Sequence, residues 1–222
     1  MGGLIPLGDA SRRPSRAAII TIFIIALNAF AFLQELSGGN RFVYTWSVVP
    51  IRLMHGHSAI TLLTSMFMHG GWLHIIGNMI YLWAFGPAIE DAMGSFRFLF
   101  FYLAGGLIAM FAQVMGDPYS TVPVLGASGA IAAVMGAFIV TFPRDRIRTL
   151  LWILIFIRVT YIPAIFLIGF WFVIQLLNAG SVAQVSTGGV AYLAHVAGFL
   201  FGVITGRLFA KPRPIPYPMP RY

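Results

Sequence analysis

The chain has 222 residues, of which 59% are hydrophobic and 9% are charged, and its mean hydropathy is +0.88. Soluble domains average about 25% charged residues, so this composition excludes an ordinary soluble enzyme and predicts a multi-pass integral membrane protein. The chain has no cysteine, which excludes disulfides, thiol nucleophiles and thiolate metal sites.

The formal net charge of +8 reflects membrane topology, because the basic residues gather at the ends of apolar runs. By the positive-inside rule, this distribution predicts an even number of spans with both termini in the cytoplasm. We therefore expect the lipid bilayer as a partner and no nucleic acid. The residues concerned are Arg12, Arg13, Arg16, Arg97, Arg144, Arg146, Arg148, Arg207, Lys211, Arg213 and Arg221.

Six apolar runs each approach the ~20 residues that a helix needs to cross the hydrocarbon core. We expect helices, because backbone polar groups must be paired within lipid. The first run also has the arginines and small residues of a signal peptide, but it continues past that pattern to Leu33. The runs lie near Ala17–Leu36, Trp72–Asp91, Phe96–Met115, Val124–Phe142, Tyr161–Leu177 and Val190–Ala210. The predicted fold is all-α, a bundle of six transmembrane helices.

This topology divides the chain into three parts: a cytoplasmic N-terminal segment (1–16), a membrane domain (17–210) and a cytoplasmic proline-rich tail (211–222). The tail alternates proline and is predicted to be non-helical. The long first loop, residues 37–71, is expected to be ordered on the outer surface.

The apolar run Leu150–Ile157 is too short to span a membrane. We interpret it as an interfacial approach to the fifth helix. The alternative is a single tilted helix that continues through Arg158, whose guanidinium would reach the headgroups.

Four polar side chains are predicted to lie at one depth of the bundle. The second, fourth and sixth spans all enter from the outer face. His74 and Asn78, Ser128, and His195 lie near the starts of these spans, within a layer one or two helical turns thick. These side chains can therefore meet.

Stripes of small residues follow two of these positions. Ser128 is followed by Ala132 and Gly136, and His195 by Gly198 and Gly202. Such stripes allow close packing of membrane helices. Contact between them would bring the serine hydroxyl toward the imidazole, which is the geometry of a nucleophile and its general base.

Hydrogen-bond donors are expected beside this pair. His74 and Asn78 are spaced i, i+4 and share a helix face. The backbone N–H of Ser128 lies at a helix N-terminus, where amides have no intrahelical partner. Converging donors of this kind form an oxyanion hole.

Three motifs in this order resemble the rhomboid family of intramembrane serine proteases. Gly126-Ala127-Ser128-Gly129 resembles its GxSG motif, His74 and Asn78 match its HxxxN, and "AHVAGFLFG", with Gly198 and Gly202, resembles its last helix. The resemblance runs from about Ile60 to Phe209.

The resemblance implies Ser128 as nucleophile, His195 as general base, and His74, Asn78 and the Ser128 amide as oxyanion donors. It implies structural parts for His69 and Glu90. Two departures stand out. Ile60 and Thr61 replace a Trp-Arg pair found in some members, and Ala132 replaces a tyrosine that stacks on the catalytic imidazole in some. Something else must therefore hold His195.

The predicted function is cleavage of single-span or polytopic membrane-protein substrates near the extracytoplasmic face, with the fifth helix as a lateral gate and without a cofactor. The alternative is a rhomboid-like pseudoprotease that binds transmembrane helices without cutting them. A transporter is disfavoured because deeper ionisable residues and a repeat are not seen. A metal site is not expected, because the candidate ligands lack a compact spacing; they are His55, His57, His69 and His74. We expect a bacterial inner-membrane protein, and the sequence does not predict its oligomeric state.

Overall fold

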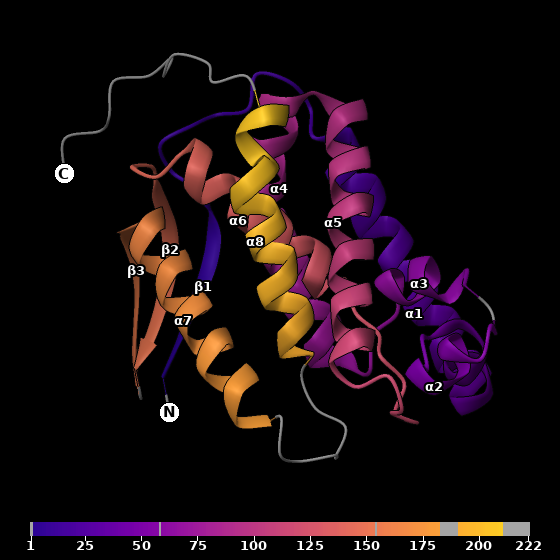
Figure 1. The fold of residues 1–222 in the computed structure, drawn as a ribbon. Coiled ribbons are helices and arrows are strands. Elements are labelled where there is room, and N and C mark those ends of the chain that lie inside the picture. Colours follow the sequence, from indigo (N-terminus) through magenta and orange to yellow (C-terminus); the bar gives the residue numbers. More distant parts are fainter. Residues whose placement is uncertain (1, 58, 154, 183–190, 211–222) are drawn as a thin grey trace.

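The computed structural model describes residues 2–57, 59–153, 155–182 and 191–210. In these ranges the chain forms a helical bundle with a three-stranded antiparallel sheet at one side (Figure 1). The elements are β1 (Gly2–Asp9), α1 (Ile19–Trp46), α2 (Pro50–Met54), α3 (Thr61–Thr64), the 3₁₀ helix η1 (Ser65–Phe67), α4 (Trp72–Met93), α5 (Ser95–Gly116), α6 (Ser128–Thr141), β2 (Arg146–Ile153), β3 (Phe156–Pro163), α7 (Ala164–Val182) and α8 (Tyr192–Phe209).

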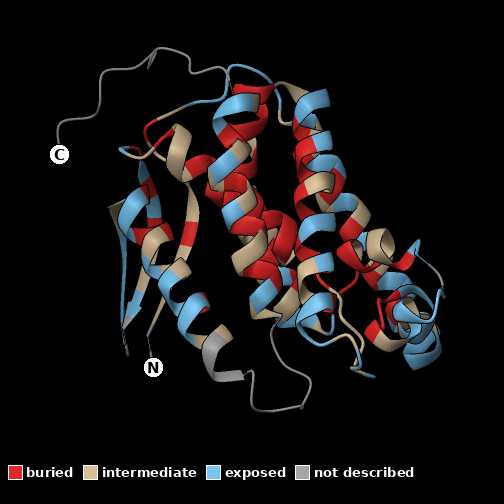
Figure 2. Ribbon diagram, viewed as in Figure 1, coloured by how far each residue is buried: buried red, intermediate tan, exposed pale blue. Residues whose placement is uncertain are grey.

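Helix α6 forms the centre of the bundle. It packs against α4, α5 and α8, and every residue from Gly129 to Phe138 is buried. Figure 2 shows this buried interior beside the largely exposed outer face of α7. Six of those ten residues are alanine or glycine, so several helices can approach α6 closely.

The contact between α6 and α8 joins backbone to backbone. A Cβ atom added to Gly198 would overlap the carbonyl oxygen of Gly129, and one added to Gly202 would overlap that of Ala133. The small-residue stripes predicted from the sequence therefore do meet, and glycine is required at both positions.

Glu90 joins the ends of three helices at one end of the bundle. Its carboxylate accepts hydrogen bonds from the backbone N–H groups of Ile20 and Thr21 at 2.9 and 2.8 Å, and from the hydroxyls of Thr21 and Ser95, both at 2.8 Å. The first turn of α1 lacks intrahelical acceptors, and Glu90 supplies them from α4.

The described part of the first loop is ordered, as predicted, but the loop begins later than expected. Helix α1 continues ten residues past Leu36 to Trp46, with a kink at Gly39, where φ is 58°. The remaining loop contains α2, α3 and η1. The backbone N–H of Val124 donates to the carbonyl of Val48 at 2.7 Å, which ties this loop to the segment that precedes α6.

The prediction of an all-α fold was wrong in one region. The run Leu150–Ile157 is not part of a tilted helix, because residues 150–153 and 156–157 lie in the antiparallel pair β2 and β3. Its position at the membrane interface stays a prediction. The N-terminal segment supplies the third strand, with Leu4 opposite Leu151. The central strand β2 is paired on both sides, which satisfies its backbone groups without a helix.

The six predicted apolar runs each contain a helix in the described residues. Four of these, α1, α4, α5 and α8, are long and apolar enough to cross a membrane, whereas α6 and the described apolar part of α7 are shorter. The number of spans and the side on which the termini lie remain predictions. So does the division into three parts, and the tail 211–222 lies outside the described residues.

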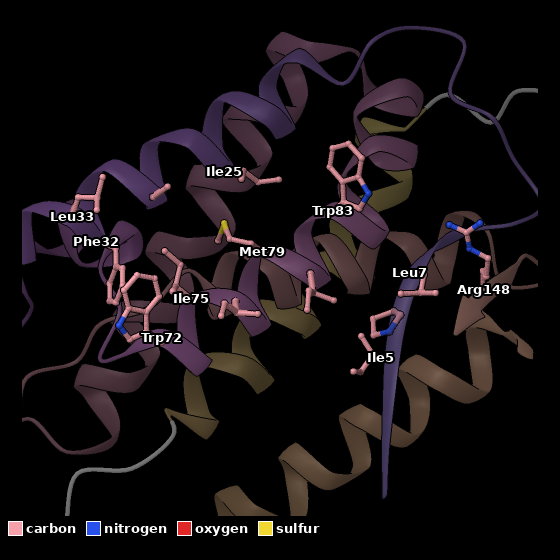
Figure 3. A pocket seen from close by; sticks show the side chains of 14 residues that line it. Ile5, Leu7, Ile25, Phe32, Leu33, Trp72, Ile75, Met79, Trp83 and Arg148 are labelled. Carbon is pink, nitrogen blue, oxygen red and sulfur yellow. The ribbon is translucent and has the colours of Figure 1, made fainter. Parts of the chain in front are cut away.

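An apolar groove with a volume of about 740 Å³ lies between α1, α4 and β1 (Figure 3). Trp72, Met79 and Trp83 of α4 line it, and Arg148 of β2 lies at one end. By helical spacing this face of α4 is opposite the face that carries His74 and Asn78. The groove is therefore separate from the predicted site.

Candidate active site

Ser128 is the first residue of α6 and is half-buried. The turn before it depends on Gly126, whose φ of 136° is one that residues with a Cβ rarely adopt. The N–H of Gly126 donates to the carbonyl of Ser65 at 2.9 Å, which fixes the turn to the first loop. The serine side chain is therefore held at a helix start while it remains accessible.

His195, in the first turns of α8, lies beside this serine. Its Nε2 is 2.7 Å from Ser128 Oγ, which is hydrogen-bond distance. The imidazole is almost fully buried, at 7% exposure. The predicted meeting of the two side chains is present, and the close contact of α6 with α8 brings it about.

Three side chains that the sequence analysis did not identify surround the imidazole. Gln175 of α7 lies with its Oε1 2.7 Å from His195 Nδ1. The ring of Trp171 lies 5.8 Å from the imidazole centroid, and Tyr192 packs edge-on at 6.3 Å. These groups contact His195 from α7 and from the first turn of α8.

Gln175 left a signal in the sequence. Between Ala164 and Leu177 no other residue has an amide or charged side chain. A lone amide in an apolar helix is often a contact between helices. Trp171, one turn earlier, gave no such signal, because an aromatic residue in an apolar helix is common.

His74 of α4 lies on the other side of Ser128. A Cβ atom added to Gly126 would lie 3.0 Å from His74 Nε2 and 3.5 Å from Ser128 Oγ, so both groups border the same small space. The N–H of Gly70 donates to His74 Nδ1 at 3.3 Å. In the neutral ring the proton is then on Nε2, which makes this atom a donor facing that space.

Asn78 follows His74 by one helical turn on the same face of α4. It is buried, and its Nδ2 has no hydrogen-bond partner among the described residues. A buried amide nitrogen without an acceptor is costly. Asn78 therefore presents an unused donor in the interior of the bundle.

His69 lies near the end of the first loop, next to His74, and is bonded to α1. Its backbone N–H donates to both carboxylate oxygens of Glu35, at 2.9 and 3.1 Å, and its ring packs edge-on against His74 at 5.0 Å. Burial, and secondarily His74, lowers the pKa of His69 to about 3. The ring is therefore neutral near pH 7.

The remaining predicted positions lie outside this cluster. Gly129, Gly198 and Gly202 are in the α6–α8 contact, and Glu90 is at the far end of α4. His55 and His57 lie in the exposed part of the first loop. Within the described residues, no group of three or more histidine, aspartate or glutamate side chains is placed to hold a metal ion.

Residues 56–212 match the model of the Rhomboid domain. The match covers well over half of the chain. The chain belongs to the rhomboid family. It is an integral membrane protein of that family, and the named proteases among its relatives support a protease-type function.

Its relatives come from bacteria and from organelles. The chain is 32% identical over 151 residues to Rhomboid protease GluP of Bacillus subtilis, a match that covers 63% of this chain and 29% of that protein. It is 30% identical over 160 residues to Rhomboid protein 1, mitochondrial, of Saccharomyces cerevisiae, covering 69% and 43%. Rhomboid-like protein 11, chloroplastic, of Arabidopsis thaliana is 25% identical over 212 residues, covering 90% and 69%. The chain thus spans less than half the length of the first two relatives.

Proposed function

We propose that this rhomboid is an intramembrane serine endopeptidase that cuts transmembrane segments of membrane-protein substrates with the dyad Ser128 and His195. The observation that carries the proposal is the 2.7 Å contact between Ser128 Oγ and His195 Nε2. Burying an ionisable side chain such as histidine among membrane helices costs free energy, and residues buried in this way are typical of functional sites.

In the first step, Ser128 Oγ attacks the carbonyl carbon of the scissile peptide bond while His195 Nε2 takes the hydroxyl proton. The carbonyl oxygen becomes an oxyanion. His195 then gives the proton to the leaving amide nitrogen, the C–N bond breaks, and an acyl-enzyme remains. Water attacks the acyl carbon, His195 takes a proton from the water and returns it to Oγ, and the serine is regenerated.

The oxyanion donors in this proposal are His74, Asn78 and the backbone N–H of Ser128. Three features support them: the Nε2–H tautomer of His74, the unpaired Asn78 Nδ2, and the position of Ser128 at a helix start. Preorganised donors act on charge that develops in the transition state. His69 and Glu90 have structural roles in this proposal. His69 bonds to Glu35 through its backbone N–H, and Glu90 accepts hydrogen bonds from the start of α1.

We further propose that six helices span the membrane with both termini in the cytoplasm, which places the dyad toward the extracytoplasmic side. The arginine distribution supports this topology. We retain the bacterial inner membrane as the expected location. Cysteines added singly at the two termini and in the first loop, then tested with an impermeant maleimide on spheroplasts, would check both points.

In this topology we propose α7 as the lateral gate for substrates. It packs mainly on α8 and on the strands that precede it, and it exposes Phe166, Phe170 and Leu176 on its outer face. Because the chain has no cysteine, a cysteine pair that joins α7 to α4 can be introduced cleanly. Cross-linking should stop cleavage and reduction should restore it; full activity of the cross-linked form would contradict the gate.

The direct test is cleavage of a single-span reporter by the purified protein in liposomes. Ser128→Ala and His195→Ala should each abolish product, whereas Ser120→Ala and His55→Ala, which alter a serine and a histidine outside the cluster, should not. Lack of product from wild type over a panel of helix-unstable reporters would contradict the proposal and favour the alternative, a rhomboid-like protein that binds transmembrane helices without cutting them.

A further inference from the structure

Gln175 is a polar residue in a helix that otherwise offers lipids and neighbours an apolar surface. The residues on both sides of it, Ile174 and Leu176, are exposed, whereas Gln175 is 8% exposed. Ala164, Ile168, Trp171 and Gln175 recur at i, i+4, i+7 and i+11, which places them on one face of α7. The amide is therefore directed into the bundle.

The amide has a partner there. Burying an amide without a hydrogen bond costs free energy, so buried amides are nearly always bonded. Gln175 Oε1 lies 2.7 Å from His195 Nδ1, whereas the other ring nitrogen, Nε2, is the one that contacts Ser128.

This contact fixes the protonation pattern of the imidazole. A carbonyl oxygen only accepts hydrogen bonds, so Nδ1 must carry the proton that it shares with Gln175. In the neutral ring Nε2 then has a free lone pair. That lone pair lies 2.7 Å from Ser128 Oγ, in the state that a general base requires.

We propose that Gln175 is a positioning residue for the reaction: its amide oxygen holds His195 in the Nδ1–H tautomer with Nε2 directed at Ser128. The inference rests on the proposed function and adds a third member, contributed by α7, to the serine–histidine pair. Trp171 and Tyr192 flank the ring on other sides. Together these three contacts hold the imidazole of His195 in a chain that has alanine at position 132.

Kinetics of reporter cleavage test the proposal with three variants. Gln175→Leu removes the acceptor at similar size and should lower kcat by about 10²-fold, the lower end of what general-base catalysis contributes, with KM unchanged. Gln113→Leu is the matched control. Gln113 of α5 accepts a hydrogen bond from the backbone N–H of Ala194 at 3.2 Å, so its amide bonds to the neighbour of His195 and not to the imidazole. This control should keep kcat.

Gln175→Glu keeps an acceptor oxygen and should restore activity. A carboxylate also favours the imidazolium, so the acidic limb of the pH–rate profile should move to higher pH. A merely structural role for Gln175 would leave that limb in place. Wild-type kcat in Gln175→Leu, or an unmoved profile in Gln175→Glu, would overturn the inference while cleavage by wild type leaves the proposed function intact.

A second readout does not need activity. In protein with ¹⁵N-labelled histidine, the signals of His195 are assigned by their loss in His195→Ala. Wild type should show one tautomer, protonated at Nδ1, and Gln175→Leu should show both. An Nε2–H ring in wild type, or no change in Gln175→Leu, would overturn the inference. If wild type cleaves no reporter but shows the expected tautomers, the proposed function fails and the positioning of His195 by Gln175 stands.

Discussion

Helices α6 and α7 contact α8 in different ways. Helix α6 meets it through backbone atoms, with Gly198 and Gly202 pressed on carbonyl groups of α6. Helix α7 meets it through side chains: Phe172 stacks on Phe199 at 4.2 Å, and Gln175 binds His195. Backbone contacts of this kind leave no room for adjustment, whereas side-chain contacts can be broken and remade by rotation. The two reacting groups are thus held on the rigid pair, and the orientation of the base depends on the third helix.

The largest expected effect comes from breaking the α6–α8 contact. Gly202→Ala places a methyl group on the carbonyl of Ala133, and overpacking of this kind costs about 1–3 kcal/mol or more. We expect a lower thermal midpoint in detergent and loss of cleavage.

The matched control is Gly169→Ala in α7, where an added Cβ meets nothing within 4 Å. Alanine is the better helix former by about 1 kcal/mol, so the midpoint should stay or rise. Equal destabilisation by the two substitutions would remove the distinction between the two contacts.

Asn78→Ala tests the proposed oxyanion donors on α4, the helix that packs against α6. Loss of one oxyanion donor should lower kcat by about 10²–10³-fold. Stability should not fall, because the amide nitrogen of Asn78 has no partner to lose within the described residues. The measurements are reporter kinetics and a thermal midpoint for each protein. Loss of folding with kcat per folded molecule unchanged would assign Asn78 to structure instead.

Trp171→Leu weakens the side-chain contact of α7 with the imidazole and leaves Gln175 in place. Aromatic contacts contribute about 0.5–1.5 kcal/mol, so kcat should fall about two- to tenfold. The effect should be smaller than that of Gln175→Leu. If Trp171→Leu is the more damaging of the two, ring packing rather than the hydrogen bond holds His195.

The effect on cleavage should be smallest in the sheet, where Asp9 ends β1 far from the reacting groups. Burial, followed by the neighbouring Asp145 carboxylate, raises the pKa of Asp9 to about 7 from its ordinary value of 3.8. The folded state therefore holds a proton that the unfolded chain releases above pH 4. Stability should fall as pH rises from about 4 to 7 and stay lower above that window.

Asp9→Asn should remove this part of the pH dependence. The difference between the thermal midpoints at pH 5 and pH 8 should be smaller in the variant than in wild type. The same difference in both proteins would show that Asp9 does not titrate in the folded state as described.

Particular residues explain how far the sequence predicted this structure. The stripes after Ser128 and His195 predicted the α6–α8 contact, because small residues at helical spacing permit one kind of packing. The strands that contain most of Leu150–Ile157 were not predicted, because β2 pairs with Gly2–Asp9, which is far away in sequence. Gln175 was missed because an amide shows its partner only when the helices are placed. Local sequence patterns thus predict helices and small-residue stripes. Contacts between residues that are far apart in the sequence become visible only in the folded structure.

The central claim is that Ser128 is a nucleophile activated by His195. A fluorophosphonate reacts with such a serine without a peptide substrate: Oγ bonds to phosphorus and fluoride leaves. After labelling in detergent and peptide mapping, the adduct should be on Ser128, and it should be lost in His195→Ala while Gln113→Leu keeps it. Labelling at another serine, or undiminished labelling of Ser128 in folded His195→Ala, would contradict the account.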